Sequence, residues 1–164
     1  MSLLPRAAAF KLVVALSAAL AMAACAKNPG ADSLAGNGIA TPGSPQDFSQ
    51  NVGDRVFSET DSTELTPTAQ ATLDKQATWL QQYGRYNFVV EGHADERGTR
   101  EYNLALGARR ANAVKEYLVA QGVSAARLET ISYGKERPIC TESNEDCWSQ
   151  NRRGVSVITG GANS

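Results

Sequence analysis

The sequence has few of the residues that build metal sites, disulfide frameworks or basic surfaces. Its 164 residues include one histidine, which excludes a His-rich metal site, and three cysteines, too few for a miniprotein built on disulfides. With 16 Lys and Arg against 17 Asp and Glu, the net charge is −1. This balance argues against a nucleic-acid binder that relies on a basic surface, and against a disordered acidic tail. The length suits one domain.

The chain also lacks an apolar run long enough to cross a bilayer. Its longest uncharged apolar stretch runs from Leu12 to Ala24, and a helix of that length spans ~20 Å, short of the ~30 Å hydrocarbon core. The first 24 residues contain Arg6 and Lys11 but no acid. A basic start, a short apolar core and small residues at its end indicate an export signal over residues 1–24.

The residues at the end of this signal predict a lipid anchor. Met22-Ala23-Ala24-Cys25 resembles a bacterial lipobox, although Met22 replaces the commoner Leu. Cys25 then becomes the first mature residue and carries the lipid. Ala26 stands where an Asp would resemble an inner-membrane retention signal, so we expect a lipid-anchored protein of the outer membrane with its domain facing the periplasm. The alternative is an ordinary secretory signal that is cut nearby.

Composition divides the remaining chain into a tether, a domain and a short tail. Gly, Pro, Asn, Ser and Ala dominate from Ala26 to about Ser49 without apolar periodicity, so this stretch cannot offset its ordering entropy by burial. We therefore predict a flexible tether with the lipidated cysteine over 25–50, a folded domain over 51–160 and a tail over 161–164.

Apolar spacing and capping residues predict a β-α-β-α-β-β order within the domain. Thr66-Pro67 has the character of an N-cap followed by proline at the first helical position. Glycines are expected at the C′ positions of both helices. Strands are expected at 55–57, 88–92, 128–133 and 154–159, and helices at 67–83 and 99–121. This order implies an α+β fold: a mixed four-stranded sheet with helices packed on one face.

The loop after the second strand gathers the polar side chains with most chemical potential. It holds His93, Asp95, Glu96 and Arg97, at a strand end of the kind where α/β sheets bind ligands. In the next helix, Arg110 falls on the core-facing stripe, where a guanidinium needs a partner. Asp95 is the nearest candidate. The two residues then form either a structural ion pair or a site for a ligand with both an ammonium and a carboxylate.

The motifs around this loop resemble a known family. The segment from Gly92 to Thr99 (GHADERGT), together with Glu101-Tyr102-Asn103, Leu106-Gly107 and Arg109-Arg110-Ala111, is similar to the signature of the OmpA-like peptidoglycan-binding domain. Ser132 to Glu136 (SYGKE) and Asn151-Arg152-Arg153 strengthen the resemblance, which covers residues 52–159. In that family the domain binds peptidoglycan non-covalently, through the diaminopimelate of the stem peptide.

The resemblance implies site residues and partners for this chain. The implied ligand contacts are Asp61, Asp95, Asn103, Leu106 and Arg110. Thr60 stands where the family has Phe, so a contact of that ring is not carried over to this chain. No cofactor, metal or catalytic residue is implied. For a lipid-anchored member it implies a link between outer membrane and cell wall within the Tol system, with TolB as a partner. The alternatives are an OmpA-like lipoprotein outside the Tol system, or a periplasmic peptidoglycan hydrolase.

Three further features of the sequence carry expectations of their own. Cys140 and Cys147 are expected to form a disulfide, because one of the three cysteines is assigned to the lipid and periplasmic thiols are oxidised. His93 is expected to be a strand-end histidine satisfied by hydrogen bonds. Arg152 and Arg153 have the character of a solvated pair before a strand, and the resemblance makes either a possible secondary contact to ligand or partner.

Overall fold

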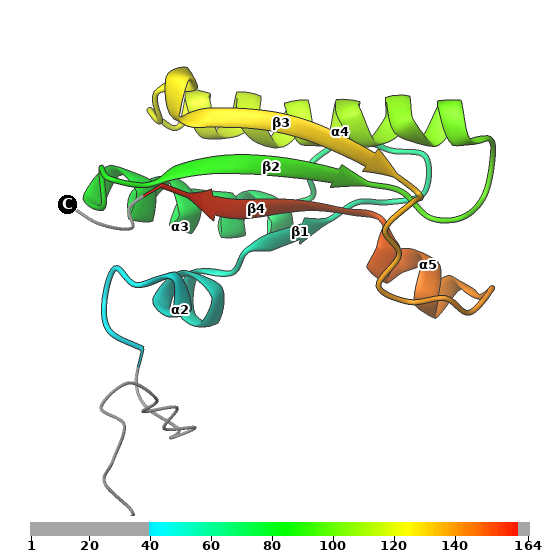
Figure 1. The fold of residues 1–164 in the computed structure, drawn as a ribbon, viewed down its shortest axis with the longest axis horizontal. Helices are drawn as coiled ribbons and strands as arrows, with labels where there is room; N and C mark the ends of the chain where they lie inside the picture. Colours follow the sequence, from blue (N-terminus) through cyan, green and yellow to red (C-terminus); the bar gives the residue numbers. More distant parts are fainter. Residues whose placement is uncertain (1–39, 161–164) are drawn as a thin grey trace, which may run out of the picture. The chain divides into compact units, whose positions relative to one another are not determined.

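The computed structural model describes residues 40–160 (Figure 1). The predicted signal, the lipidated Cys25, the tether up to residue 39 and the tail 161–164 lie outside the described residues. The elements in chain order are α2 (Pro45–Asp47), η1 (Phe48–Val52), β1 (Arg55–Phe57), α3 (Pro67–Gln82), β2 (Asn87–His93), α4 (Arg100–Ala120), η2 (Ala125–Arg127), β3 (Leu128–Gly134), α5 (Glu145–Asn151) and β4 (Arg153–Thr159).

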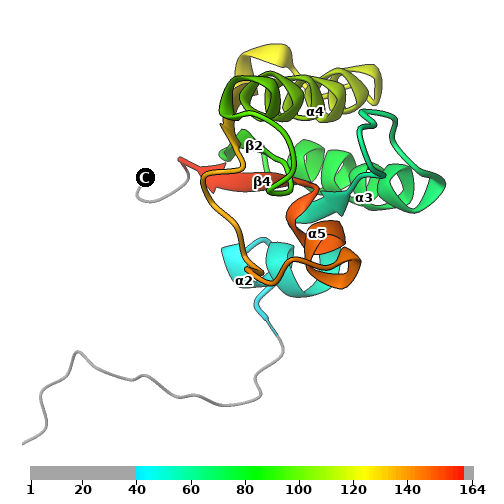
Figure 2. The same ribbon diagram turned by 90° about the vertical axis from the view of Figure 1, so that its right-hand side faces the viewer.

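The strands form one mixed sheet in the order β1-β4-β2-β3. Strands β2 and β3 are parallel, whereas β4 runs antiparallel to both β1 and β2. The first crossover therefore connects parallel strands with β4 between them, and the second connects parallel neighbours. Helices α3 and α4 lie together on one face of this sheet (Figure 2). The predicted fold is confirmed.

The core lies between that face and the two long helices. Phe88 and Val90 of β2 pack with residues of α3 such as Leu73 and Leu80 and with Val114 of α4. On α3 the apolar residues at helical spacing, Ala69, Leu73, Ala77 and Leu80, are buried. On α4 the buried residues are Asn103, Leu106, Gly107, Arg110, Ala111, Val114 and Leu118, so Arg110 lies on the core-facing stripe as its spacing predicted.

The predicted caps hold except at the end of α3. The Thr66 hydroxyl accepts the Ala69 N–H at 3.2 Å, and Gly122 follows α4 with a φ of +94°, as a C′ glycine does. Gly84 does not take the positive φ expected of it. Instead, the Arg127 guanidinium donates to the carbonyl oxygens of Leu80 and Tyr83. A side chain from a distant turn thus satisfies the exposed carbonyls at this helix end.

The folded part of the chain begins before the predicted boundary at residue 51. Residues 45–52 form the helical turns α2 and η1, and Phe48 is 2% exposed. Its ring centroid lies 5.0 Å from that of Trp79 and 4.9 Å from that of Phe88. The Asp47 carboxylate also accepts a hydrogen bond from the Trp79 indole at 3.0 Å. One buried aromatic side chain therefore fixes a segment whose composition predicted a tether up to residue 50.

Helix α5 is a second element that the apolar pattern did not predict. It begins at Glu145 after the N-cap Asn144, whose side chain accepts the Cys147 N–H at 2.9 Å. Cys140 and Cys147 form the expected disulfide, with 5.1 Å between their Cα atoms. The bridge closes the loop that leads into α5, so this short helix is held by a cap and a covalent link.

Candidate functional site

The site begins where β2 and α4 approach each other without intervening side chains. A Cβ atom added to Gly92 would lie 1.8 Å from the Gly107 carbonyl oxygen, and one added to Gly107 would lie 2.4 Å from Oγ of Ser132. Only glycine allows this backbone contact. It draws the first turns of α4 against the end of β2, and the connecting loop, residues 94–99, is forced to form a tight turn at the carboxyl end of this central strand.

Two side chains hold the backbone of this loop from either side. The Lys135 ammonium donates to the carbonyl oxygens of Glu96 at 3.0 Å and Gly98 at 2.6 Å. The Asn103 amide donates to the Arg97 carbonyl oxygen at 2.7 Å. Gly98 has a φ of +88°, which other residues rarely adopt. Three successive carbonyls are therefore bound, and the loop is preorganised.

Asp95, the central predicted residue, is buried and paired with two arginines. Its carboxylate accepts hydrogen bonds from the Arg97 side chain at 2.7 and 3.1 Å and from the Arg97 N–H at 3.1 Å. Arg152 donates to the same carboxylate at 3.3 Å. Burial alone would raise the pKa of Asp95, but the bonds from Arg97 and Arg152 outweigh it and hold the pKa below its usual value. The group is therefore an anion near neutral pH.

Arg110 does not form the ion pair with Asp95 that its position suggested. Its guanidinium is 2% exposed and donates to three backbone carbonyl oxygens, of Glu59, Ser62 and His93, each at 3.0 Å. Burial, reinforced by repulsion from Arg152, lowers the pKa of Arg110 to about 10. The guanidinium stays charged near neutral pH, and two of its five N–H groups remain free of these three bonds. Carbonyl dipoles satisfy the buried cation in place of a carboxylate.

A cavity of about 380 Å³ lies over the loop and contains most of the predicted ligand contacts. Asp61, Asp95, Asn103 and Leu106 line it, together with Thr60, Arg97, Gly98 and Tyr102. Arg110 is not among the lining residues. The structure thus brings four of the five predicted residues to one cavity and leaves the fifth buried.

Asp61 is fixed in an unusual backbone conformation at the rim of this cavity. Its φ is +51°, which within residues 40–160 no other residue except glycine shares in sign. Aspartate tolerates this region better than most residues, and the Tyr102 hydroxyl donates to its carboxylate. Tyr102 therefore orients an exposed carboxylate toward the site. Sequence reasoning did not single out this tyrosine.

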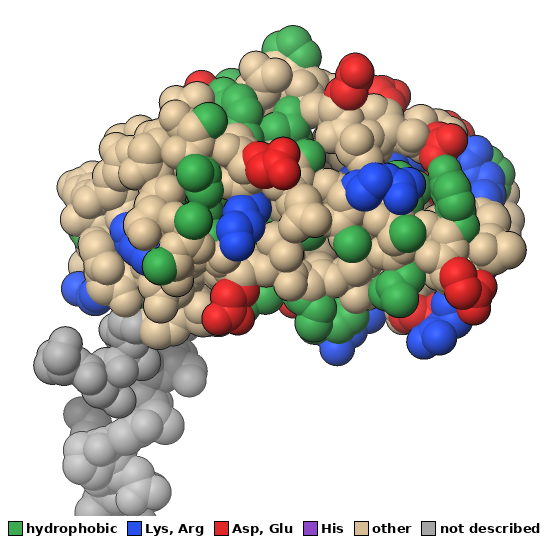
Figure 3. Space-filling model, turned by 90° about the horizontal axis from the view of Figure 1, so that it is seen from above, with side chains coloured by type: hydrophobic (Ala, Val, Ile, Leu, Met, Phe, Trp, Pro, Cys, Tyr) green, Lys and Arg blue, Asp and Glu red, His purple; other side chains and the backbone are tan. Residues whose placement is uncertain are grey.

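Arg97 contacts Trp148 beside Asp95, and sequence reasoning did not predict this contact. The Arg97 guanidinium lies 4.2 Å from the centre of the Trp148 ring, a cation–π contact. The Trp148 indole donates to the Glu96 carboxylate at 2.9 Å. Acidic and basic side chains stand close together at the end of the molecule where α4 begins (Figure 3). Helix α5 therefore packs against the loop that carries Asp95, through Arg97 and Glu96, without lining the cavity itself.

Arg152 and Arg153 are not the solvated pair that the sequence suggested. Both are 4% exposed. Besides Asp95, Arg152 contacts the Glu145 carboxylate and donates to the Ser58 carbonyl oxygen at 3.1 Å. Arg153 donates to backbone carbonyls, and its Nε has no hydrogen-bond partner within residues 40–160. Arg152 is thus a buried link between β1, α5 and the loop that carries Asp95.

His93 is only partly satisfied by hydrogen bonds. Its Nε2 lies 3.2 Å from the Glu91 carboxylate, while Nδ1 is buried and has no partner in the described part of the chain. Burial and the nearby Arg153 lower the pKa of His93, so the ring is neutral near pH 7. In the part of the chain that the structure describes, no three His, Cys, Asp or Glu side chains are arranged to hold a metal ion.

Known proteins share both the sequence and the fold. The model of the OmpA family matches residues 57–152. The chain belongs to the OmpA family. The peptidoglycan-associated lipoprotein of Mesorhizobium japonicum is 58% identical over 154 residues, covering 91% of this chain and 92% of that protein. The peptidoglycan-associated lipoprotein of Rhizobium meliloti is 57% identical over 158 residues, covering 93% and 89%.

Solved structures of other proteins agree with the architecture. The crystal structure of the peptidoglycan-associated lipoprotein from Burkholderia pseudomallei has a TM-score of 0.67 and 36% identity, and covers 71% of this chain and 100% of that one. The C-terminal domain of MotB from Helicobacter pylori shares the fold, with a TM-score of 0.62 and 24% identity over 67% of this chain and 87% of that one. Among residues 40–160, no helix has the length and apolarity to cross a membrane.

Proposed function

We propose that this chain is an outer-membrane lipoprotein that binds peptidoglycan without catalysing a reaction. The observation that carries the proposal is the preorganised cavity lined by Asp61 and Asp95. Arg110 does not line this cavity, but its guanidinium is close enough to both carboxylates for their charges to offset part of the pKa decrease that burial causes, and two of its N–H groups lie outside its three carbonyl bonds. Relatives more than half identical to the chain are named for their association with peptidoglycan. The lipid at Cys25 then holds the outer membrane and the domain holds the wall.

The ligand of this proposal is the diaminopimelate of the stem peptide. Its free end has an ammonium and a carboxylate on one carbon, and the two groups need opposite partners. The ammonium is bound by Asp95, or by Asp61 at the rim, and the carboxylate by the free N–H groups of Arg110 in a charge-assisted contact. Leu106 packs against the methylene chain, while the Asn103 oxygen, which accepts no hydrogen bond within residues 40–160, receives a ligand donor.

Binding requires a rearrangement at Asp95, because Arg97 occupies both of its carboxylate oxygens. The ligand ammonium replaces Arg97, whose guanidinium keeps its contact with Trp148 and lies 4.0 Å from the Glu145 carboxylate. The exchange of one cation for another leaves Asp95 paired throughout. Access to Arg110 likewise requires movement of the side chains that line the cavity.

Binding rather than hydrolysis suits the state of these carboxylates. An acid or base that works near neutral pH needs a pKa near the working pH. The pKa of Asp95 is shifted away from that range, and Asp61 is an exposed carboxylate held by Tyr102. By family resemblance the protein acts in the Tol system, with TolB as a partner; an OmpA-like lipoprotein outside that system is the alternative within the same class.

A co-sedimentation assay with purified peptidoglycan sacculi tests the proposal. The wild-type chain sediments with the sacculi. Asp95→Ala lowers the bound fraction at least ten-fold, because it removes the carboxylate that binds the ammonium of the ligand. Glu129→Ala, a change of an exposed carboxylate on β3, is the matched control and leaves binding unchanged. Equal retention of Asp95→Ala and wild type would refute the site, and release of soluble muropeptides by wild type would identify a hydrolase.

The predicted anchor is tested separately by fractionation. Cys25→Ser removes the atom that carries the lipid, so the variant is expected to leave the outer-membrane fraction. Wild-type and variant chains are compared by immunoblot of outer-membrane and periplasmic fractions. Persistence of Cys25→Ser in the outer membrane would exclude lipidation as the anchor.

A further inference from the structure

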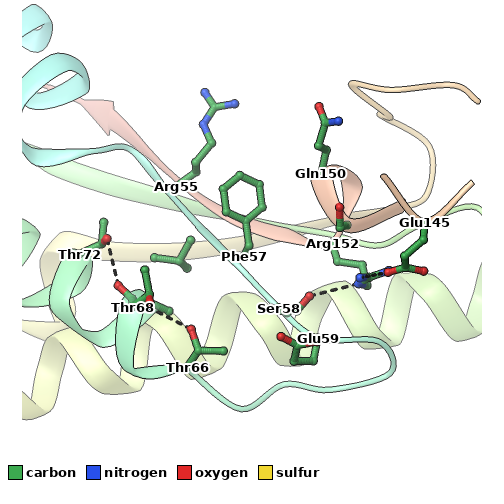
Figure 4. Close-up of a pocket in the computed structure, with 13 residues that line it drawn as sticks. Arg55, Phe57, Ser58, Glu59, Thr66, Thr68, Thr72, Glu145, Gln150 and Arg152 are labelled. Carbon is green, nitrogen blue, oxygen red and sulfur yellow. Dashed lines mark hydrogen bonds and ion pairs between the residues drawn. The ribbon is translucent and has the colours of Figure 1, made fainter. Parts of the chain in front are cut away.

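A second, larger groove runs along the free edge of the sheet. It measures about 620 Å³ and lies between the first turns of α3 and the helix α5, with β1 along its floor (Figure 4). The cavity over residues 94–99 does not include it, and the two sets of lining residues do not overlap. None of the ligand contacts of the proposed function lies in this groove.

The floor of the groove offers backbone hydrogen-bonding groups that no strand uses. Directly after β1, the Ser58 N–H donates to the Arg152 carbonyl oxygen, just before β4. Directly before β1, the Asp54 carbonyl oxygen accepts a hydrogen bond from the Ser156 N–H of β4. Since alternate residues of an antiparallel strand face its partner, the N–H and C=O groups of Arg55 and Phe57 point away from β4, into the groove. These are amide groups set to pair with another amide.

The walls of the groove combine one exposed aromatic ring with hydroxyl, amide and charged side chains. Most of the charged ones are paired, Arg55 with Asp54 and Arg152 with Glu145. Phe57 is 47% exposed, and its ring stands between Arg55 and Gln150 (Figure 4). Hydroxyls of Thr72 and Ser149 donate to carbonyls of their own helices, so their oxygens remain acceptors. An apolar ring beside several neutral acceptors and donors suits a ligand that has apolar faces and many hydroxyl groups.

The groove shares a wall with the candidate diaminopimelate site. Arg152 lines the groove and contacts Asp95 on its other side, and Glu145 lines the groove while it contacts Arg152. A ligand in the groove and a ligand in the cavity are therefore separated by one layer of side chains. Two parts of a single branched polymer can occupy both.

We infer that this groove binds the glycan strand of peptidoglycan, with one sugar ring against Phe57 and acetamido groups paired with the free edge of β1. The inference rests on the proposed function, because the glycan is the part of the polymer that is covalently joined to the stem peptide. N-acetylated sugars supply amide groups that can pair with the free N–H and C=O groups of the edge. Their hydroxyl groups can donate hydrogen bonds to the oxygens of the Thr, Ser and Gln side chains.

A protein strand added to this edge fits less well. Strand β1 has three residues, and the Glu59 carbonyl oxygen, which would continue the ladder on the free edge, already accepts a hydrogen bond from Arg110. An incoming strand would find only the peptide groups of Arg55 and Phe57. Short edges of this kind are typical of sheets that avoid strand addition.

Two ligands test the groove and the cavity independently, because one contains only the sugar part of peptidoglycan and the other only the peptide part. Isothermal titration of the full lipidated chain in detergent uses the tetramer of β-1,4-linked N-acetylglucosamine, which lacks peptide, and the free tripeptide L-Ala-γ-D-Glu-meso-diaminopimelate, which lacks sugar. Phe57→Ala is expected to weaken the tetramer about five-fold, equivalent to ~1 kcal/mol, and to leave the tripeptide unchanged. Gln150→Ala should weaken the tetramer as well.

The controls run in the opposite direction. Asp95→Ala is expected to abolish tripeptide binding and to spare the tetramer, whereas Ile131→Ala, which removes an exposed apolar side chain of β3, changes neither. No binding of the tetramer, or equal binding by wild type and Phe57→Ala, would overturn the glycan groove. Weakening of the tetramer by Asp95→Ala alone would place the sugar in the cavity and overturn it too.

Two outcomes distinguish the remaining cases. Tripeptide binding that survives Asp95→Ala refutes the proposed function and is independent of the result for Phe57→Ala. Purified TolB, added to the same titration, tests the edge as a protein site: if Phe57→Ala weakens TolB binding and the tetramer does not bind, the groove belongs to a protein strand and the glycan inference is wrong.

Discussion

The guanidinium of Arg110 is expected to stabilise the fold through its three carbonyl contacts, and Arg110→Lys isolates that contribution. The substitution keeps the charge but replaces a planar fork by a single ammonium. The carbonyls of Glu59, Ser62 and His93 belong to two separate segments, each 3.0 Å from a different guanidinium nitrogen. One ammonium can keep only one of them at full strength.

The expected cost follows from the number of bonds lost. A hydrogen bond to a charged group contributes ~1.5–3 kcal/mol. Loss of two such bonds, partly offset by rehydration of the carbonyls, gives a decrease of about 3 kcal/mol in the free energy of unfolding. Urea titrations followed by tryptophan fluorescence measure this difference, because Trp79 lies in the core.

The neighbouring arginine provides the control. Arg109 is exposed on the same helix, so Arg109→Lys should alter the free energy of unfolding by less than ~0.5 kcal/mol. A loss below ~1 kcal/mol for Arg110→Lys would refute the view that this side chain is mainly a structural link. In that case a loss of ligand binding in an Arg110 variant could be assigned to a lost ligand contact and not to a destabilised fold. We expect the opposite.

Three further predictions concern other parts of the domain. Gly92→Ala places a methyl group against the Gly107 carbonyl and should displace α4, seen as loss of the cooperative thermal transition in circular dichroism. Replacing both Cys140 and Cys147 by Ala should lower the free energy of unfolding by about 2.5 kcal/mol in urea, from the loop that the disulfide closes; equal stability with and without reductant would contradict it. Because the folded pKa of Asp95 is lowered, its contribution is present above pH ~4 and lost as the pH falls through the folded pKa, so wild type should lose more stability on acidification than Asp95→Asn.

The regular elements could be predicted from the sequence because local signals specify them. Thr66 and Pro67 mark the start of α3, and Gly122 marks the end of α4. The apolar runs around Phe88 and Leu128 mark buried strands. Each of these signals acts within a few residues of the chain, where propensity, capping and burial agree.

The partners of the buried charges could not be predicted, because they depend on contacts between distant segments. The helical position of Arg110 showed that its guanidinium needs partners. The partners are carbonyls of the β1–α3 connection and of His93, and backbone acceptors leave no trace in residue type. Arg152 and Asp95 lie 57 positions apart, and only the fold brings them together.

Phe48 illustrates the same limit in the opposite sense. One aromatic residue within a Gly- and Pro-rich segment carries no periodicity, so composition predicted a tether. Its burial depends on a hollow between Trp79 and Phe88, which is formed by other elements. The site motif itself was found by resemblance, while the geometry of its loop required the structure.

The seating of the segment before α2 has a mechanical consequence. The Gly43 carbonyl accepts hydrogen bonds from Arg85 and Tyr86, just before β2 begins, whereas the candidate site lies where β2 ends. A tension between a membrane anchor and a wall ligand would thus act along the strand axis. Ladder hydrogen bonds lie across that axis, so they share the load in shear instead of opening one after another. The sheet is oriented to withstand a pull in the direction in which the proposed function applies it.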